Sequence, residues 1–199
     1  MGFKGGWTAQ TGGKVMKKLF PIALMVLGLV FLGAGVYTVN RGFDAKDQVR
    51  EELIAQNIVT PDDASIPNTR VDDVATARSM SDIIDVHALE ATDGRTYSEM
   101  GRFLATDGGD TDDVALAVTG ADGKPVSNPL RNTAFQASSL RTSLYTSVMA
   151  FEVGNLVIGL GFMVLVLGVA VGGLGVALAG LAIPAFGRKL HVEPVAAAH

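Results

Sequence analysis

The sequence predicts an all-α membrane protein in which two transmembrane helices form a hairpin around a mainly helical, partly irregular extracytoplasmic region. Composition is the first reason, since 48% of the 199 residues are apolar and only 18% are charged. Distribution is the second, because residues 19–40 and 153–187 contain no Asp, Glu, Lys or Arg. A helix that spans a bilayer needs roughly 20 apolar residues. Each uncharged stretch therefore predicts one span.

The first span is expected at residues 19–40, after a cytoplasmic arm of residues 1–18. A cleaved signal peptide is the alternative, because Lys17 and Lys18 precede the apolar stretch. The apolar part of a signal peptide runs for about 7–15 residues, whereas this stretch continues through Val39. The greater length favours an uncleaved membrane anchor.

Residues 41–141 are expected to form the extracytoplasmic region. Apolar residues at helical spacing predict that the first span continues outward to about Gln56 and that a second helix covers residues 74–90. Thr96 and Glu99 have the spacing of a capping box, which predicts one short helical turn. The region is too broken to predict a sizeable core of its own. Its helices are therefore expected to pack on one another or on another protein.

Residues 106–128 form an acidic insertion that is rich in Gly and Asp. Turn-forming pairs such as Asp122-Gly123 predict an inserted hairpin or a flexible loop, with residues 114–118 as a candidate short strand. Asn128-Pro129 then predicts a helix start, because proline favours the first helical position. The helix that begins there is expected to lead into the second span.

Residues 142–187 are expected to hold a juxtamembrane extension and the second transmembrane helix, with the bilayer part near residues 156–183. Pro184 and Gly187 are expected to end this helix, and residues 188–199 to form a cytoplasmic tail. A re-entrant turn near Gly172 is the alternative, but two short spans need about 40 residues. One long helix is therefore predicted.

Charge predicts the orientation of the hairpin. Four lysines lie before the first span, and Arg188 and Lys189 follow the second. Residues 41–141 hold ten basic and eighteen acidic residues, a net charge of −8, against +4 for the remainder. Basic segments stay on the cytoplasmic side of a membrane. The pattern predicts a multi-pass protein of the plasma membrane with both termini cytoplasmic and the central loop outside.

Glycines recur every seven residues in both spans, which returns them to nearly one helix face. In lipid, such small residues allow two helix backbones to come into van der Waals contact. The spacing predicts a helix-packing surface. The alternative is that the spacing has no structural role, because glycine is common in membrane helices generally. The surface can join the two spans or bind another subunit, and both uses stay open. Its residues are Gly28, Gly35, Gly154, Gly161, Gly168 and Gly175, together with Gly172, which forms a GxxxG pair with Gly168.

The sequence predicts no catalytic, cofactor-binding or metal-binding residue. The chain has no Cys, and neither span holds an ionisable residue or a histidine that could ligate haem or bind a quinone. No phosphate-binding glycine loop occurs, and a pI near 5.3 argues against nucleic acid. We therefore expect a non-enzyme that contacts the lipid bilayer and other proteins, with no nucleic acid and no small-molecule substrate.

The acidic insertion contains a cluster of aspartates that could gather a calcium ion. The cluster lacks the glycine and the glutamate that an EF-hand loop requires at its sixth and twelfth positions. A solvated acidic loop is therefore the favoured interpretation. The aspartates are Asp107, Asp110, Asp112 and Asp113.

His87 is the only histidine of the extracytoplasmic region. Zinc and non-haem iron sites need several converging ligands, so His87 is expected to be a packed or interfacial residue. Four serines precede the second span without the Gly-x-Ser-x-Gly elbow of a hydrolase, and they are interpreted as helix contacts. These serines are Ser138, Ser139, Ser143 and Ser147.

Several short strings carry a resemblance to a known family: residues 35–38, 49–56, 87–92, 94–97, 128–135 and 139–148. Over residues 16–169 the chain resembles small two-helix membrane proteins of actinobacteria, which are often labelled aromatic ring-opening dioxygenases. The stretch 101–127 is longer here than the resemblance predicts. A single histidine cannot supply the ligands of ring-opening iron chemistry, so the dioxygenase label is rejected.

In size and topology the chain is also similar to an accessory subunit of the actinobacterial cytochrome bcc–aa3 supercomplex, a menaquinol:oxygen respiratory assembly. That resemblance implies a non-catalytic subunit that acts in assembly or stability, with cytochrome bcc and aa3 subunits as partners and no cofactor of its own. The alternative is an envelope membrane protein whose extracytoplasmic loop binds a ligand or a metal ion.

Overall fold

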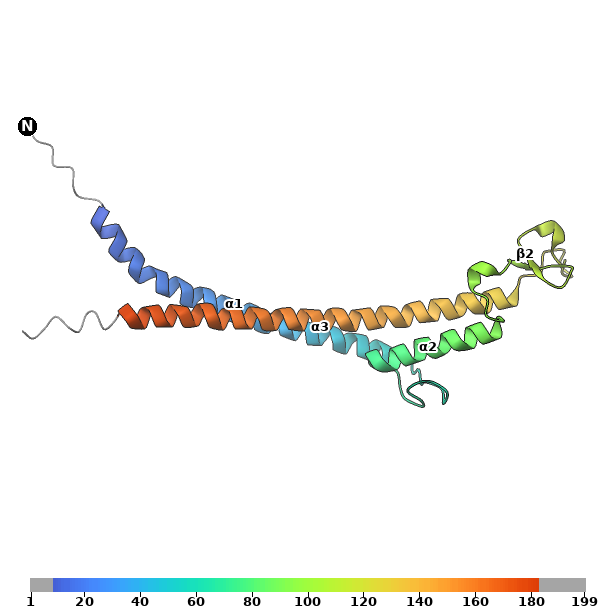
Figure 1. The fold of residues 1–199 in the computed structure, drawn as a ribbon, viewed down its shortest axis with the longest axis horizontal. Helices are drawn as coiled ribbons and strands as arrows, with labels where there is room; N and C mark the ends of the chain where they lie inside the picture. The colour runs from blue at the N-terminus through green and yellow to red at the C-terminus, as the bar shows by residue number, and fades with distance from the viewer. Residues whose placement is uncertain (1–8, 183–199) are drawn as a thin grey trace, which may run out of the picture. The chain divides into compact units, whose positions relative to one another are not determined.

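The computed structural model describes the backbone of residues 9–182 and the side chains of residues 19–180. The predicted helix end at Pro184 and Gly187, the tail 188–199 and the first part of the N-terminal arm lie outside the described residues. The described chain divides into two compact units, which Figure 1 shows with their elements labelled. We call residues 9–43 and 155–182 the helix-pair unit, and residues 44–154 the central unit.

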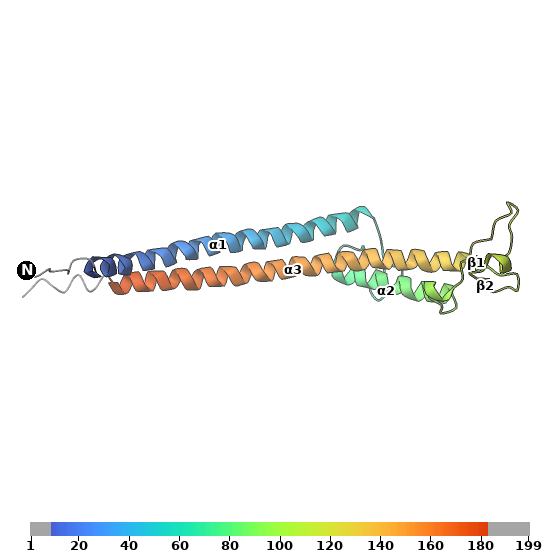
Figure 2. The same ribbon diagram turned by 90° about the horizontal axis from the view of Figure 1, so that it is seen from above.

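The helix-pair unit consists of segments of two long helices, α1 (Ala9–Ala55) and α3 (Pro129–Ala182). In this unit α1 and α3 lie side by side and antiparallel in both ribbon views (Figures 1 and 2). Both helices are long and apolar enough to cross a membrane, and the most apolar 18-residue stretch of each has a mean hydropathy of 2.5. The two long apolar helices of the predicted fold are therefore confirmed.

The bounds of α1 and α3 decide several predictions about the two long helices. The outward continuation of α1 to about Gln56 is confirmed, since the helix ends at Ala55. The N-terminal arm is partly helical, because α1 already begins at Ala9. The alternative of a re-entrant turn is wrong, because α3 runs without a break through Gly172. A continuous helix satisfies its backbone hydrogen bonds within itself, whereas a turn inside the apolar stretch would leave some of them without partners.

Local capping interactions determine where the elements of the central unit begin. Helix α2 (Val74–Ala91) starts after Asp73, whose Oδ1 accepts a hydrogen bond from the Thr76 amide at 2.8 Å. A short 3₁₀ turn (Tyr97–Glu99) carries the predicted capping box, with the Thr96 amide donating to Glu99 Oε2 at 2.7 Å. Asn128 Oδ1 accepts from the Leu130 amide at 3.0 Å where α3 begins. The predicted helix, turn and helix start are all confirmed.

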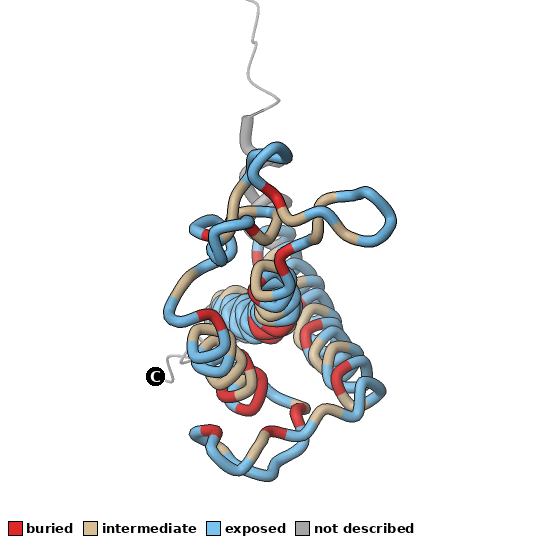
Figure 3. Tube along the Cα trace, turned by 90° about the vertical axis from the view of Figure 1, so that its right-hand side faces the viewer, coloured by how far each residue is buried: buried red, intermediate tan, exposed pale blue. Residues whose placement is uncertain are grey.

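The central unit has a small apolar core that joins parts of α1, α2 and α3. In Figure 3 the buried positions gather on the sides of these helices that face one another. Partly buried side chains such as Met80 and Ile84 of α2 pack against this core. The helices of this region therefore pack on one another, one of the two predicted arrangements. The core residues are Leu53, Val71, Ala77, Leu144, Val148 and Phe151.

The acidic insertion is a compact hairpin. Strand β1 (Phe103–Leu104) pairs antiparallel with β2 (Asp110–Thr111), and a further bridge joins Thr119 to Pro125. The candidate strand at 114–118 is wrong, because residues 114–116 form a 3₁₀ turn. The reason is local: the Asp113 carboxylate accepts a hydrogen bond from the Ala115 amide at 2.8 Å and starts this turn.

Candidate functional site

The glycines of the two long helices lie where α1 and α3 touch in the helix-pair unit. A Cβ built on Gly28 would lie 2.5 Å from the Gly172 Cα and 2.8 Å from the Gly168 carbonyl oxygen. A Cβ on Gly161 would meet the Val39 amide nitrogen at 2.8 Å, and one on Gly175 would meet the Pro21 carbonyl at 2.9 Å. Backbone atoms therefore form this contact, and it has no room for a larger residue.

Other glycines of α1 and α3 lie either in buried positions or on the outside of the helix pair. Gly35 faces the Leu165 side chain, and Gly154, which lies in the central unit, is buried. A second group has open space within 4 Å of the built Cβ and is exposed on the outside of the pair. This group contains Gly33 of α1 and Gly159, Gly173 and Gly180 of α3. In the helix-pair unit the glycines of the predicted surface thus lie at the contact between α1 and α3, and the outward glycines form a separate set.

Asp110 is not a solvated member of an acidic loop, contrary to the prediction for the aspartate cluster. Its carboxylate accepts hydrogen bonds from Arg95 at 2.6 Å, from the Gly101 amide at 3.0 Å and from Asn128 at 3.3 Å. Only 15% of the side chain is exposed. The Gly101 amide, followed by the Arg95 guanidinium, holds the pKa of Asp110 below its usual range. Asp110 ties the hairpin to the start of α3.

The other aspartates of the cluster also have structural partners. Asp112 Oδ1 accepts from the Arg102 amide at 3.0 Å and from Arg102 Nε at 3.1 Å, and these contacts lower the pKa of Asp112. Asp107 and Asp113 bond to amides two residues further along the chain. Between residues 19 and 180, no group of three His, Asp or Glu side chains is arranged to hold a metal ion.

His87 is exposed on α2, so of the two predicted places, packed or interfacial, the packed one is wrong and the interfacial one stays a prediction. Its Nε2 lies 2.7 Å from Asp63 Oδ2, and this hydrogen bond lowers the pKa of the Asp63 carboxyl. About half of each side chain is exposed. The residue points toward the loop 57–67, which sequence reasoning could not place beside α2.

The serines and threonines at the start of α3 bond to their own helix. The hydroxyls of Ser139, Thr142 and Thr146 each donate to the carbonyl oxygen four residues earlier, at 2.8–2.9 Å. Ser143 and Ser147 do the same at 3.1 and 3.4 Å. These hydroxyl protons are therefore directed at the helix backbone.

One face of α3 in the central unit carries no charge. Its exposed residues follow one another at intervals of four, three, four and three positions, the spacing of a helix-packing seam. Phe135 and Met149 are 53% and 67% exposed, and the three residues between them are the hydroxyl residues that bond to their own helix. We call this surface the outer face of α3: Phe135, Ser139, Thr142, Thr146 and Met149.

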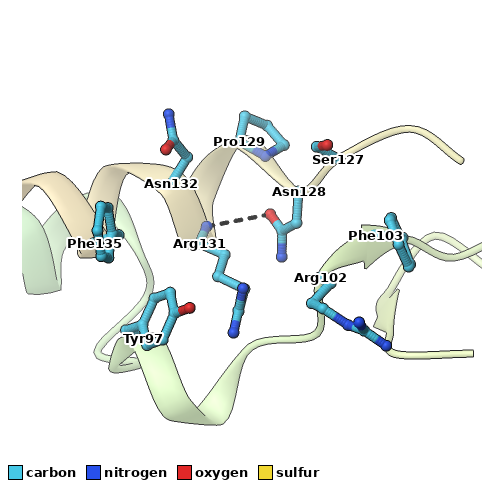
Figure 4. A pocket seen from close by; sticks show the side chains of 9 residues that line it. All are labelled: Tyr97, Arg102, Phe103, Ser127, Asn128, Pro129, Arg131, Asn132 and Phe135. Carbon is cyan, nitrogen blue, oxygen red and sulfur yellow. Dashed lines mark hydrogen bonds between the residues drawn. The ribbon is translucent and has the colours of Figure 1, made fainter.

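A pocket of about 710 Å³ lies beside the start of α3 (Figure 4). The Arg131 guanidinium carbon lies 3.9 Å from the centroid of the Tyr97 ring, and the Phe135 ring lies 5.7 Å from Tyr97. Arg102 and Phe103 stand on the opposite side. Sequence reasoning missed this pocket. The spacing of Arg131 and Phe135, four apart on a helix, was the available signal.

A second hollow in the central unit, of about 500 Å³, is more apolar. Leu53 and Ile58 line one side of it, and Met80, Ile84 and Leu140 line the others. Ser143 and Ser147 also lie on its wall, but their hydroxyls bond to α3 itself. This hollow offers apolar contact and few polar groups.

The chain matches no protein-family model, no curated protein and no solved structure.

Proposed function

We propose that the protein is a non-catalytic accessory subunit of a membrane protein complex. In this proposal α1 and α3 cross the plasma membrane, both termini are cytoplasmic and the central unit lies outside. The positive charge around the two spans and the acidic central region support this orientation. The glycine contact brings the two spans together.

The outer face of α3 is the observation that carries the proposal. In a unit with many acidic residues, this face has no charge, and its hydroxyls donate to the helix backbone. When another protein covers exposed apolar side chains such as Phe135 and Met149, the free energy falls by about 25 cal/mol for each Å² of apolar surface removed from water. Spacings of three and four residues suit a packed helix as the covering element.

The partners that we propose are the redox subunits of the cytochrome bcc–aa3 supercomplex, and the role is assembly or stability. The sequence resemblance supports this choice of partner. The proposal assigns no electron transfer to this chain, since residues 19–43 and 155–180 contain no histidine or cysteine, the usual ligands of haem and iron–sulfur clusters.

The proposal is tested by purifying the tagged protein from its own membranes in mild detergent. We expect haem-containing subunits to copurify, and the double variant Thr142→Glu/Thr146→Glu to lose them because it buries two charges in the interface. The matched control is Gln136→Glu, an exposed position on another side of α3. A wild-type preparation without cytochromes would refute the respiratory assignment, and equal recovery with both variants would refute the outer face.

The orientation is tested separately with single cysteines, which the natural chain lacks. In intact cells, a membrane-impermeant maleimide should label a cysteine in place of Ser98 in the central unit and spare one in place of Lys4. Labelling at position 4 but not at position 98 would reverse the proposed topology.

A further inference from the structure

The pocket beside the start of α3 contains an arginine that makes no salt bridge to any side chain that the structure describes, although the unit around it is acidic. Residues 44–154 hold nine basic and nineteen acidic side chains. Within the part of the chain that the structure describes, the Arg131 guanidinium makes no salt bridge, and its Nε is buried without a hydrogen-bond partner. A cation that stays unpaired among so many carboxylates is available to an external anion.

Tyr97 orients this arginine. The Tyr97 ring covers one face of the Arg131 guanidinium at 3.9 Å, a cation–π arrangement. The Tyr97 ring is in turn held against Phe135. Figure 4 shows the guanidinium between Tyr97 and Arg102, with the side chain of the following residue, Asn132, pointing away from it. The terminal nitrogens of Arg131 are therefore preorganised.

The start of α3 does not itself supply donors for an anion. The Leu130 and Arg131 amides donate to Asn128 Oδ1, and the Asn132 amide donates to the Asn128 carbonyl oxygen. Arg102 is engaged by Asp112 through its backbone amide and its Nε. Of the two arginines that line the pocket, Arg102 is thus paired with Asp112, and Arg131 is the one that makes no salt bridge among the described residues.

We propose that this pocket binds a carboxylate that is attached to an aromatic or aliphatic group. A guanidinium and a carboxylate match as planar, two-point partners. The nearby Asp112 carboxylate and the acidic unit disfavour a doubly charged phosphate more than a single charge. Phe103, Phe135 and Tyr97 provide walls for the apolar part, and a volume of about 710 Å³ suits a small organic molecule or the end of a peptide. Phe135 also belongs to the outer face of α3, but binding to the pocket is tested without the partner proposed above.

The test uses the full-length protein in lipid nanodiscs and saturation-transfer NMR with 3-phenylpropionate, with empty nanodiscs as the blank. We expect saturable binding that is at least about tenfold tighter than that of the neutral 3-phenylpropanamide, because an ionic hydrogen bond is lost in the amide. Equal binding of acid and amide would overturn the proposal without any variant. Tighter binding of inorganic phosphate than of the acid would overturn the assignment to a carboxylate.

The variants locate the site. Arg131→Gln should weaken binding of 3-phenylpropionate by about tenfold or more, and Arg131→Lys by less, because it keeps the charge and loses the two-point geometry. Arg70→Gln makes the same charge change at an exposed position away from the pocket and should leave binding unchanged. Wild-type affinity in Arg131→Gln would refute the pocket.

Two sources could present such a carboxylate, a free small acid or the C-terminus of another protein. A short glycine peptide ending in a phenylalanine carboxylate is therefore competed against 3-phenylpropionate, with the amidated peptide as its control. Tighter binding of the peptide acid assigns the pocket to a protein terminus, and tighter binding of the free acid assigns it to a small molecule. Displacement by the amidated peptide to the same extent would contradict the proposal.

Discussion

The helix-pair unit and the central unit bring helices together by opposite means. In the helix-pair unit, α1 and α3 touch through backbone atoms at glycines such as Gly28 and Gly168, and most large side chains point outward. In the central unit, apolar side chains such as Phe151 and Leu144 are buried in a core, and the ion pair of Arg141 with Asp85 also joins α3 to α2. The two units therefore depend on different forces.

This difference in packing corresponds to the two surroundings that the sequence predicts, water for the central unit and lipid for the helix pair. Water drives apolar side chains into a core, so the central unit buries them. Lipid is as apolar as leucine and gives no such drive, so close packing of backbones must hold the helices. One helix, α3, follows both rules along its length, since it buries Phe151 in the central unit and Gly161 in the helix-pair unit.

The largest expected effect breaks the central core. Phe151→Ala should lower the free energy of unfolding of the central unit by about 3–5 kcal/mol, because a side chain that is 4% exposed leaves a cavity. Met149→Ala, two positions earlier and 67% exposed, should cost less than about 0.5 kcal/mol. Thermal or denaturant unfolding in detergent measures both. Equal losses would show that the core does not stabilise this unit.

The next effect breaks the backbone contact of the helix pair. Gly28→Leu should destabilise the pairing of α1 and α3 by about 3 kcal/mol, because the new side chain meets backbone atoms that cannot turn aside. Gly33→Leu adds the same side chain to α1 where nothing lies within 4 Å, and it should be tolerated. Hydrogen exchange of the helix-pair amides in nanodiscs distinguishes the two. A tolerated Gly28→Leu would contradict the contact.

A smaller effect concerns the polar connections of the central unit. Asp110→Ala should cost about 1–2 kcal/mol, because the Gly101 amide and the Arg95 guanidinium lose their shared acceptor. Asp107→Ala removes an exposed turn carboxylate from the same hairpin and serves as the control. Proteolysis of the hairpin should accelerate in Asp110→Ala alone. Identical cleavage rates in the two variants would contradict a structural role of Asp110.

The smallest expected effect is on the pH dependence of stability, which should differ between the central unit and the helix pair. Asp73, Asp110 and Asp112 have pKa values lowered by hydrogen bonds in the folded chain. Their stabilisation is complete above the unfolded pKa near 4 and is lost as the pH falls through the lower folded values. Between pH 6 and pH 3 the central unit should therefore weaken, while the helix pair should not. Hydrogen exchange corrected for its intrinsic pH dependence tests this, and equal loss in both units would contradict it.

Much of the fold could be predicted because its signals are local. A capping box, such as that of Thr96 and Glu99, requires groups three residues apart, and the sequence displays them directly. The start of α3 at Asn128-Pro129 and the length of the apolar helices are of the same kind. Apart from the candidate strand at 114–118, which a local turn replaces, the failed predictions concern partners that are distant in the sequence. His87 meets Asp63, 24 residues away, and Asp110 meets Asn128, 18 residues away.

By itself, the sequence determined the two long apolar helices, the helical spacing of α2 and the seven-residue recurrence of glycine, because each depends on the periodicity of one helix. Only the tertiary structure decided which surface the glycines contact and that Arg131 lies on Tyr97 beside an open pocket. These features depend on how separate segments meet in space, and periodicity along one helix does not encode the identity of its neighbour.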